Sequence, residues 1–440
     1  MEIKRDQYLN QLIRSMDNGA IKVITGIRRC GKSYLLDPLF HDYLVKAGVP
    51  EERIIKIDLS DAKNQSLCNP LNLSKKLEAS LPKEGNAYLF IDEIQLCEAV
   101  ENPFFSGVKT ESGKKPMITF YAVLNGLLSS HKNVDVYVTG SNSKMLSSDI
   151  LTDFRGRGCE IRMRPLSFLE YLSANEGSDR GQAWRDYLRY GGMPFSLRYT
   201  DFGDRENYLR SLFETVYYKD IIERNHLQTD TSIREFTKVV ASSVGSLTNV
   251  SRIADTFRST EQKGIGRITI DNYIRCLEDS FLLEEAERYD VRGRHIMNGN
   301  KKYYFVDTGL RNALLNFRQP DRGHLMENVI YNELLSLGYG VDVGAIRTYE
   351  AKNPPSNSSP QREIDFIAEK GNKKYYIQSA YSAEEDAKMV QEKKPLLAVR
   401  DSFPKILIEG DDFAPYYDND GIIHVGVIEF LLRGSSLLDH

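Results

Sequence analysis

The chain has 440 residues, of which 41% are hydrophobic and 27% charged, and its net charge is −4. These values are typical of a folded protein with two or three domains, and they exclude a broadly basic surface, so any nucleic-acid site must be local. Five scattered cysteines without a C-x-x-C pair argue against disulfides or a zinc site, and the absence of an apolar leader or an apolar run of about 18 residues predicts a cytoplasmic protein outside the membrane.

The first informative segment, residues 26–33, fits the pattern G-x-x-x-x-G-K-[ST] between a predicted strand at 21–24 and a predicted helix. This order aims backbone N–H groups and the positive end of a helix dipole at a phosphate. Lys32 can reach the outer phosphates, and the Ser33 hydroxyl can hold Mg²⁺. The alternative is a glycine-bearing turn with no ligand. The predicted nucleotide-binding residues are Gly26, Ile27, Arg28, Arg29, Cys30, Gly31, Lys32, Ser33 and Tyr34.

A second segment adds a predicted hydrolytic function. The apolar run at 87–91 predicts a buried parallel strand that ends in Asp92 and Glu93. Asp92 would hold Mg²⁺ together with Ser33, and Glu93 would act as the general base for the attacking water, which is typically worth about 10²–10⁴-fold in rate. Two solvated acids are the alternative, and the glycine loop upstream argues against them.

Further strands are predicted at 54–59, 134–140 and 159–163, with helices at 71–81 and 118–128 between them. Alternating strands and helices predict an α/β fold in which helices cover both faces of a parallel sheet. Ligands of such sheets bind at the carboxyl ends of the strands. We therefore expect the glycine loop, the two acids and residues 139–142 at one rim.

Two other features carry catalytic hypotheses. Ser141 or Asn142 could orient the attacking water or contact the γ-phosphate. The alternative is a hydrophilic turn, which has the same residue types. Arg155 and Arg157 precede the last of these strands and are expected at the same rim. Arg157 is the candidate arginine finger, supplied across a subunit or domain boundary, and a solvated loop arginine is the alternative.

Together, the glycine loop with its double arginine, the LFIDEIQ strand and the VTGSN strand end resemble a prokaryotic AAA-family P-loop ATPase. Downstream blocks at 187–194, 216–221 and 304–310 are similar to members of that family that carry a domain of unknown function, DUF4143. The resemblance covers nearly the whole chain. It implies a P-loop core with an additional catalytic strand and Glu93 as the base.

The middle of the chain turns helical. Residues 166–215 are predicted as a helical lid, and residues 216–295 as a winged-helix-like domain, in which three helices precede strands. Arg267, Arg275 and the basic stretch 292–295 could meet DNA phosphates. Neighbouring acids reduce the net positive charge of this region, and winged helices also dock proteins. Contact with DNA and contact with a protein therefore both stay open.

Residues 296–440 suggest a degenerate catalytic domain. A helix at 325–334 with Glu327, a strand with Asp365, a hairpin turn and a second strand resemble the PD-(D/E)XK restriction-endonuclease core. That chemistry uses carboxylates around a metal and a lysine. Here the second strand has Gln378 and Ala380 in place of the acid and the lysine, and neither Lys373 nor Lys374 has the spacing to replace them. We therefore predict an inactive nuclease-like domain.

The domains are accordingly expected at 1–165 (P-loop ATPase core), 166–215, 216–295 and 296–440. The expected activity is hydrolysis of ATP with Mg²⁺ that drives conformational change in the C-terminal domains, acting on DNA or a protein partner. A homo-oligomer is compatible with the sequence. The alternatives are a slow ATP-dependent binding switch and an ATP-gated metal-dependent nuclease.

Overall fold

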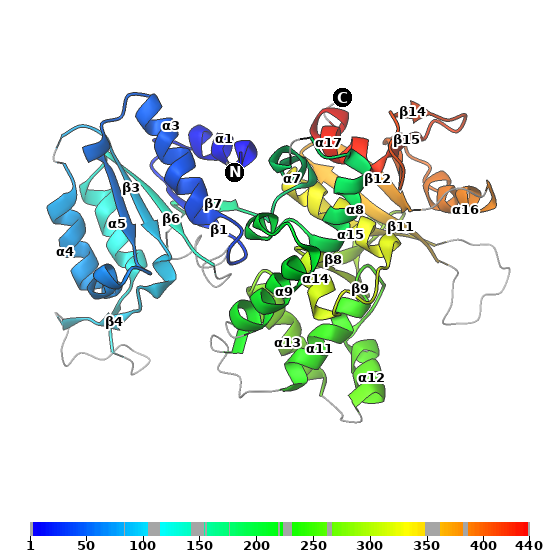
Figure 1. The fold of residues 1–440 in the computed structure, drawn as a ribbon, viewed down its shortest axis with the longest axis horizontal. Coiled ribbons are helices and arrows are strands. Elements are labelled where there is room, and N and C mark those ends of the chain that lie inside the picture. The colour runs from blue at the N-terminus through cyan, green and yellow to red at the C-terminus, as the bar shows by residue number, and fades with distance from the viewer. Residues whose placement is uncertain are drawn as a thin grey trace. The chain divides into compact units, whose positions relative to one another are not determined.

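The computed structural model describes residues 3–82, 84–103, 115–141, 154, 156–175, 177–218, 221–222, 231–261, 266–347, 361–381 and 386–438. The chain divides into two compact units, Glu2–Arg164 and Pro165–His440 (Figure 1). No helix among the described residues is long and apolar enough to cross a membrane.

The N-terminal unit is built on a five-stranded sheet in the order β2-β3-β6-β1-β7, and every neighbouring pair in it is parallel. Its strands are β1 (Ile21–Thr25), β2 (Ile54–Asp58), β3 (Ala87–Asp92), β6 (Val134–Thr139) and β7 (Gly158–Arg162), with a separate pair β4 (Val100–Glu101) and β5 (Met117–Ile118). Its α-helices are α1 (Asp6–Arg14), α2 (Lys32–Tyr34), α3 (His41–Lys46), α4 (Pro70–Ser80) and α5 (Phe120–Ser130), with a π-helical segment, Leu35–Phe40, between α2 and α3. Because β6 lies between β1 and β3, the unit is a P-loop fold with an additional strand, and the predicted α/β class is confirmed.

Alternation along β3 shows how helices cover both faces of this sheet. Leu89 and Ile91 belong to the apolar core that α4 and α5 share with the strands. Phe90 points to the other face, where its ring centroid lies 5.6 Å from that of Phe40 in the π-helical segment. Since successive side chains of a strand point to opposite faces, the apolar run of β3 is buried along its whole length. That burial places the polar residues that follow β3 at the edge of the sheet.

The C-terminal unit contains an eight-stranded mixed sheet in the order β14-β15-β13-β12-β11-β10-β8-β9. Its strands are β8 (Leu283–Asp290), β9 (His295–Phe305), β10 (Gly340–Arg347), β11 (Gln361–Lys370), β12 (Lys373–Ala380), β13 (Lys405–Glu409), β14 (Tyr416–Tyr417) and β15 (Ile423–Gly426). Its α-helices are α7 (Phe168–Ala174), α8 (Arg180–Tyr190), α9 (Phe202–Leu212), α11 (Thr231–Ser242), α12 (Val250–Glu261), α13 (Arg267–Asp279), α14 (Thr308–Leu314), α15 (Arg322–Ser336), α16 (Asp386–Leu397) and α17 (Val427–Leu438). The predicted hairpin at Gly371 joins β11 to β12, which are antiparallel.

Three helices, α11, α12 and α13, precede the antiparallel pair of β8 and β9, in the order that the sequence predicted. However, β8 also pairs with β10 in parallel, so this hairpin is the edge of the large sheet and not a free-standing wing. A winged helix that contacts DNA therefore stays a prediction, as do the domain boundaries at 165, 215 and 295.

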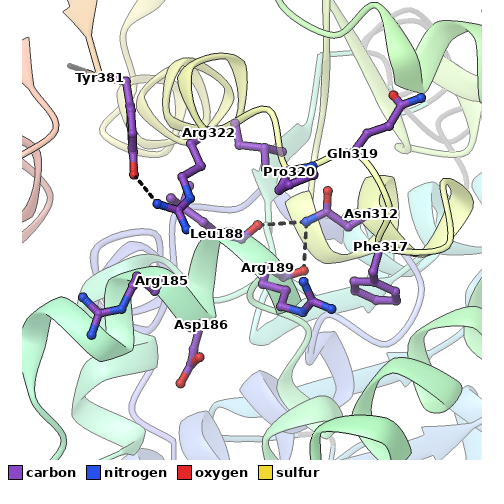
Figure 2. Close-up of a pocket in the computed structure, with 11 residues that line it drawn as sticks. Arg185, Asp186, Leu188, Arg189, Asn312, Phe317, Gln319, Pro320, Arg322 and Tyr381 are labelled. Carbon is purple, nitrogen blue, oxygen red and sulfur yellow. Dashed lines mark hydrogen bonds between the residues drawn. The ribbon is translucent and has the colours of Figure 1, made fainter.

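The contact between α8 and α14 is fixed by polar groups (Figure 2). The Asn312 amide donates to the carbonyl oxygens of Leu188 and Arg189, each at 2.9 Å, at the end of α8. The last carbonyl groups of a helix have no hydrogen-bond donor within the helix. The Asn312 side chain supplies donors for these two carbonyl groups. Beside this contact lies a cavity of about 170 Å³. Arg322 and Tyr381 line it, and the Arg322 guanidinium donates to the Tyr381 hydroxyl at 3.3 Å.

Candidate nucleotide-binding site

The loop between β1 and α2 has a conformation that requires glycine at two positions. Gly26 has φ 135° and Gly31 has φ 105°, both in the region that side chains disfavour. A Cβ atom at Gly26 would lie 2.0 Å from the carbonyl oxygen of Met163, because the loop passes directly against the end of β7. The Met163 N–H in turn donates to the Thr25 carbonyl at 2.8 Å. The loop is therefore shaped by the neighbouring strand.

Arg5 holds this loop from the side of α1. Its guanidinium donates to the Cys30 carbonyl at 3.2 Å and to the Arg164 carbonyl at 2.6 Å, and the residue is 2% exposed. One side chain thus ties the loop to the chain segment that follows β7. Arg5 was not among the predicted site residues, because nothing near it in the sequence indicates its partners.

Lys32 lies inside the curve of the loop. Its ammonium donates to the carbonyl oxygens of Gly26 at 3.0 Å and Ile27 at 3.1 Å, and the residue is buried. An ammonium group has three donors in a flexible arrangement, so it can exchange carbonyl partners for phosphate oxygens. The predicted role of Lys32 is compatible with this position.

Asp92 and Ser33 meet at the carboxyl end of β3. Burial raises the pKa of Asp92, and hydrogen bonds from the Thr139 and Ser33 hydroxyls oppose that shift by stabilising the carboxylate. A cavity of about 200 Å³ opens beside this pair, with Asp58 and Lys56 also in its wall. Mg²⁺ is commonly bound through one or two protein oxygens plus the phosphates of its nucleotide, and the two residues fit that pattern.

Glu93 follows β3 in a left-handed backbone conformation, with φ 54°. Its N–H donates to the Thr139 hydroxyl oxygen at 2.9 Å, while its carboxylate accepts from the Gln95 amide and, at 3.4 Å, from the Ser141 hydroxyl. Gln95 also donates to the Ser141 hydroxyl at 3.3 Å. Thr139 therefore links both acids, and Gln95 orients the second of them. Neither role was predicted, although both residues lie inside the motifs.

The structure brings most of the predicted site residues to one edge of the sheet. The glycine loop, the two acids and Ser141 all follow the carboxyl ends of the parallel strands β1, β3 and β6. Asn142 and Arg155 lie outside the described residues. The predicted common rim thus holds for the described members of the set, apart from Arg157.

The expected position of Arg157 at this rim is wrong. Its carbonyl accepts from the N–H of Ile21 at 2.7 Å, and Gly158 pairs with Ile21 in the parallel register of β7 and β1. Arg157 therefore lies at the amino edge of the sheet, a strand length of roughly 15 Å from the loop. Arg157 precedes its strand, and in a parallel sheet only the residues that follow the strands reach the carboxyl edge.

Comparisons with known proteins agree with this geometry. A family model described as an AAA domain matches residues 18–172, and a domain of unknown function, DUF8612, matches residues 181–321, so the assignment to DUF4143 is not shown. An uncharacterized protein of Haemophilus influenzae is 32% identical over 439 residues, which cover 98% of this chain and 99% of that protein. An uncharacterized protein of Methanocaldococcus jannaschii is 26% identical over 87% of this chain and 79% of its own length.

Among solved structures, the Walker-type ATPase PABY2304 of Pyrococcus abyssi is similar, with 16% identity and a TM-score of 0.46 over 71% of this chain and 96% of that chain. The ORC2 protein of Aeropyrum pernix has 11% identity and a TM-score of 0.38 over 74% of this chain and 93% of that chain.

Proposed function

Because this chain belongs to the same family as the Haemophilus influenzae relative and contains an AAA domain, we propose that it binds and hydrolyses ATP with Mg²⁺. The proposed site is the carboxyl edge of the five-stranded sheet. The observation that carries the proposal is the position of Thr139. Its hydroxyl contacts both Asp92 and Glu93, and so joins the acid that pairs with Ser33 to the candidate base.

In the proposed mechanism, the loop amides and Lys32 hold the phosphates, and Ser33 with Asp92 holds Mg²⁺. The bound metal would supply charge neutralisation on the phosphate oxygens. Glu93 accepts the proton of the attacking water, and its carboxylate is oriented for this by Gln95 and Ser141.

The alternative is a slow ATP-dependent switch, with the same binding residues and little turnover. Two further points are predictions from the sequence. One is that ATP turnover drives conformational change in the C-terminal unit, and the other is that this unit docks DNA or a protein.

Two substitutions test the proposal. Lys32→Ala should lose ATP binding by calorimetry, since it removes the cation inside the loop, while the exposed control Lys46→Ala should bind like the parent. Glu93→Gln should bind ATP like the parent and lose at least about 10²-fold in steady-state turnover, whereas the exposed control Glu78→Gln should keep it.

Affinity within a few-fold of the parent in Lys32→Ala would contradict the binding site. Equal and measurable turnover in Glu93→Gln and the parent would remove Glu93 from the role of base. If the parent binds ATP but turns over as slowly as Glu93→Gln, the binding switch is the better description.

A further inference from the structure

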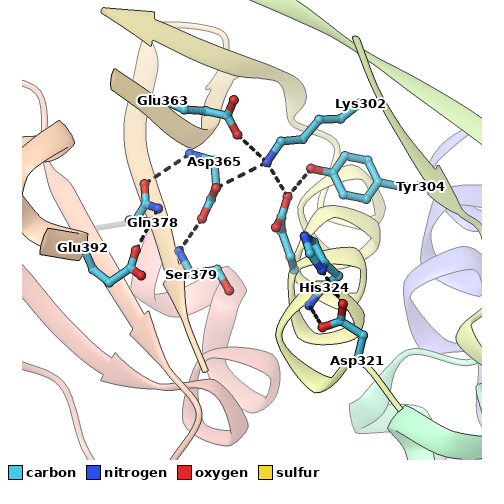
Figure 3. Close-up of polar contacts among 10 residues, drawn as sticks. Lys302, Tyr304, Asp321, His324, Glu363, Asp365, Gln378, Ser379 and Glu392 are labelled. Carbon is cyan, nitrogen blue, oxygen red and sulfur yellow. Dashed lines mark hydrogen bonds and ion pairs between the residues drawn. The ribbon is translucent and has the colours of Figure 1, made fainter. Parts of the chain in front are cut away.

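A second polar site lies in the C-terminal unit, where side chains of β9, β11, β12 and α15 converge (Figure 3). A cavity of about 550 Å³ opens there, and its wall contains five carboxylates: Asp321, Glu327, Glu363, Asp365 and Glu392. Two of them, Glu327 and Asp365, are the acids that the sequence placed in a degenerate nuclease-like site. The structure brings these two acids together.

Lys302 of β9 occupies the point at which three of these carboxylates converge. Its Nζ atom lies 2.7 Å from Glu327 Oε1, 2.7 Å from Glu363 Oε1 and 3.4 Å from Asp365 Oδ1. The Lys302 side chain is only 4% exposed. The carboxylates raise the pKa of the Lys302 amino group and outweigh the opposing effect of its burial, so the group stays charged. One ammonium is therefore the shared counterion of three acids.

Other donors contact two of these carboxylates and the neighbouring acid Glu392. The Tyr304 hydroxyl donates to Glu327 Oε1 at 2.6 Å, and the Ser379 N–H donates to Asp365 Oδ2 at 2.9 Å. Gln378, which stands where the nuclease pattern has an acid, accepts from the Asp365 N–H at 3.3 Å through its amide oxygen. Its amide nitrogen donates to Glu392 at 3.3 Å. The amide is thus engaged on both sides.

This arrangement does not fit the metal that a nuclease-like fold implies. Oxygen ligands of Mg²⁺ or Ca²⁺ converge on the ion at about 2.0–2.6 Å, and here they converge on a nitrogen atom at hydrogen-bonding distances. Throughout the described part of the chain, no group of three or more His, Cys, Asp or Glu residues is arranged to hold a metal ion. A divalent ion and the ammonium of Lys302 would compete for the same carboxylate oxygens.

We propose that Lys302 is the built-in cation of this site, which takes the place of a divalent metal ion and keeps a latent metal site closed. The lysine comes from a strand outside the E-x-K motif, and therefore motif spacing cannot identify it. Without the ammonium, Glu327, Glu363 and Asp365 lose the cation that they share, and their hard oxygen atoms become available to another cation. Such a cluster should bind an oxygen-preferring divalent cation.

The test uses the full-length protein without nucleotide and Mn²⁺ as the probe, with bound Mn²⁺ measured by electron paramagnetic resonance. The parent and the charge-preserving control Lys302→Arg should show no binding that depends on Asp365. Lys302→Met, which keeps an unbranched side chain and removes the charged Nζ atom, should bind one additional Mn²⁺ per chain, at least about 10-fold more tightly than any Mn²⁺ bound by the parent. Adding Asp365→Asn to Lys302→Met should abolish that binding.

Thermal unfolding provides a second readout, because three uncompensated carboxylates should lower the Tm of Lys302→Met. Mn²⁺ should raise that Tm and leave the Tm of Lys302→Arg unchanged. If Lys302→Met does not fold, Lys302→Met with Glu363→Gln carries less uncompensated charge and should fold and bind Mn²⁺.

Mn²⁺ binding by the parent that is lost in Asp365→Asn would overturn the proposal. So would a folded Lys302→Met variant that binds no additional Mn²⁺, and so would failure of both variants to fold with Mn²⁺ present, since the metal should replace the missing charge.

Discussion

Thr139 connects the two acids of the candidate ATP site, and its hydroxyl is the contact that the sequence motifs did not reveal. It donates to Asp92 and accepts from the Glu93 N–H. A single hydroxyl thereby fixes both the metal ligand and the candidate base. Residues of this kind act through others, and so they leave no signature of their own in the sequence.

Replacing Thr139 by valine keeps the shape of the side chain and removes the hydroxyl. The N–H of Glu93 and one oxygen of Asp92 then lose a partner, which typically costs about 1–3 kcal/mol for a buried polar group. We expect Thr139→Val to reduce turnover of ATP by roughly 10-fold or more, as measured under saturating Mg²⁺. Thr139→Ser keeps the hydroxyl and should resemble the parent; a fully active Thr139→Val would show that this contact is dispensable.

Asp307 gives a pH prediction in the C-terminal unit. Its buried carboxylate accepts from the Gly192 N–H at 2.7 Å and from the Leu310 N–H at 2.9 Å, and burial raises its pKa to about 6 in spite of these bonds. The folded state thus binds the proton more tightly than the unfolded state, whose pKa is near 3.8. Its contribution to the free energy of unfolding should fall as pH rises from about 4 to about 6, by about 3 kcal/mol in total.

Asp307→Asn cannot ionise and should lack this pH dependence. The measurement is the free energy of unfolding of parent and variant by urea titration at several pH values between 4 and 7, with the exposed helix cap Asp201→Asn as control. Parallel curves for Asp307→Asn and the parent would show that the carboxylate titrates alike in both states.

At the scale of elements, the predicted strands and helices of the N-terminal unit appear at the expected places. The apolar run of β3 is the pattern that a strand buried on both faces leaves in a sequence. The strands β1 and β6 are buried as well, although each carries one charged residue, Lys22 or Asp135, and these two form an ion pair. In the C-terminal unit, β9 and β10 carry polar residues among the apolar ones and were not predicted. Their pairing partners, and not a local apolar run, define these strands.

The glycine loop gives a prediction at this scale. Gly26→Ala should abolish measurable ATP binding and lower the free energy of unfolding, because the added Cβ atom would overlap the carbonyl oxygen of Met163 in a backbone conformation that alanine disfavours. Gly126→Ala in α5 is the matched control, since a Cβ atom there meets nothing within 4 Å.

In the control, alanine should raise the free energy of unfolding by roughly 0.5–1 kcal/mol, which is the difference in helix propensity. Calorimetry with ATP and urea unfolding measure both effects. Parental ATP affinity in Gly26→Ala would mean that the loop adapts to a side chain.

At the scale of the whole molecule, Arg157 separates action within one chain from action between chains. It lies at the amino edge of the sheet, so it cannot contact the phosphates bound by its own loop. If Arg157 is an arginine finger, a second copy of the chain must supply it, and the specific ATPase activity should then rise with protein concentration. Arg157→Ala should reduce turnover about 10³-fold and spare ATP affinity.

The control is Arg14→Ala on α1, a helix of the same unit, and the measurement is specific activity over a wide range of protein concentration. Activity that is independent of concentration, together with full turnover in Arg157→Ala, would identify Arg157 as a solvated arginine of the amino edge.

Where function depends on neighbours along the chain, the site could be predicted from the sequence. A strand, a glycine loop and a helix form one continuous segment, so residues 26–33 predict their own geometry. Two acids at the end of an apolar strand carry the same kind of local information.

Contacts between residues far apart in the chain became visible only in the folded protein. The order of the strands places Thr139 of β6 against the acids of β3, and it places Arg157 at the opposite edge from the loop. Pairing of β9 with β8 at the end of the large sheet brings Lys302 among Glu327, Glu363 and Asp365. Hydrogen bonds and ion pairs depend on distances of a few ångströms, and for residues far apart in the chain only sheet order and packing set those distances.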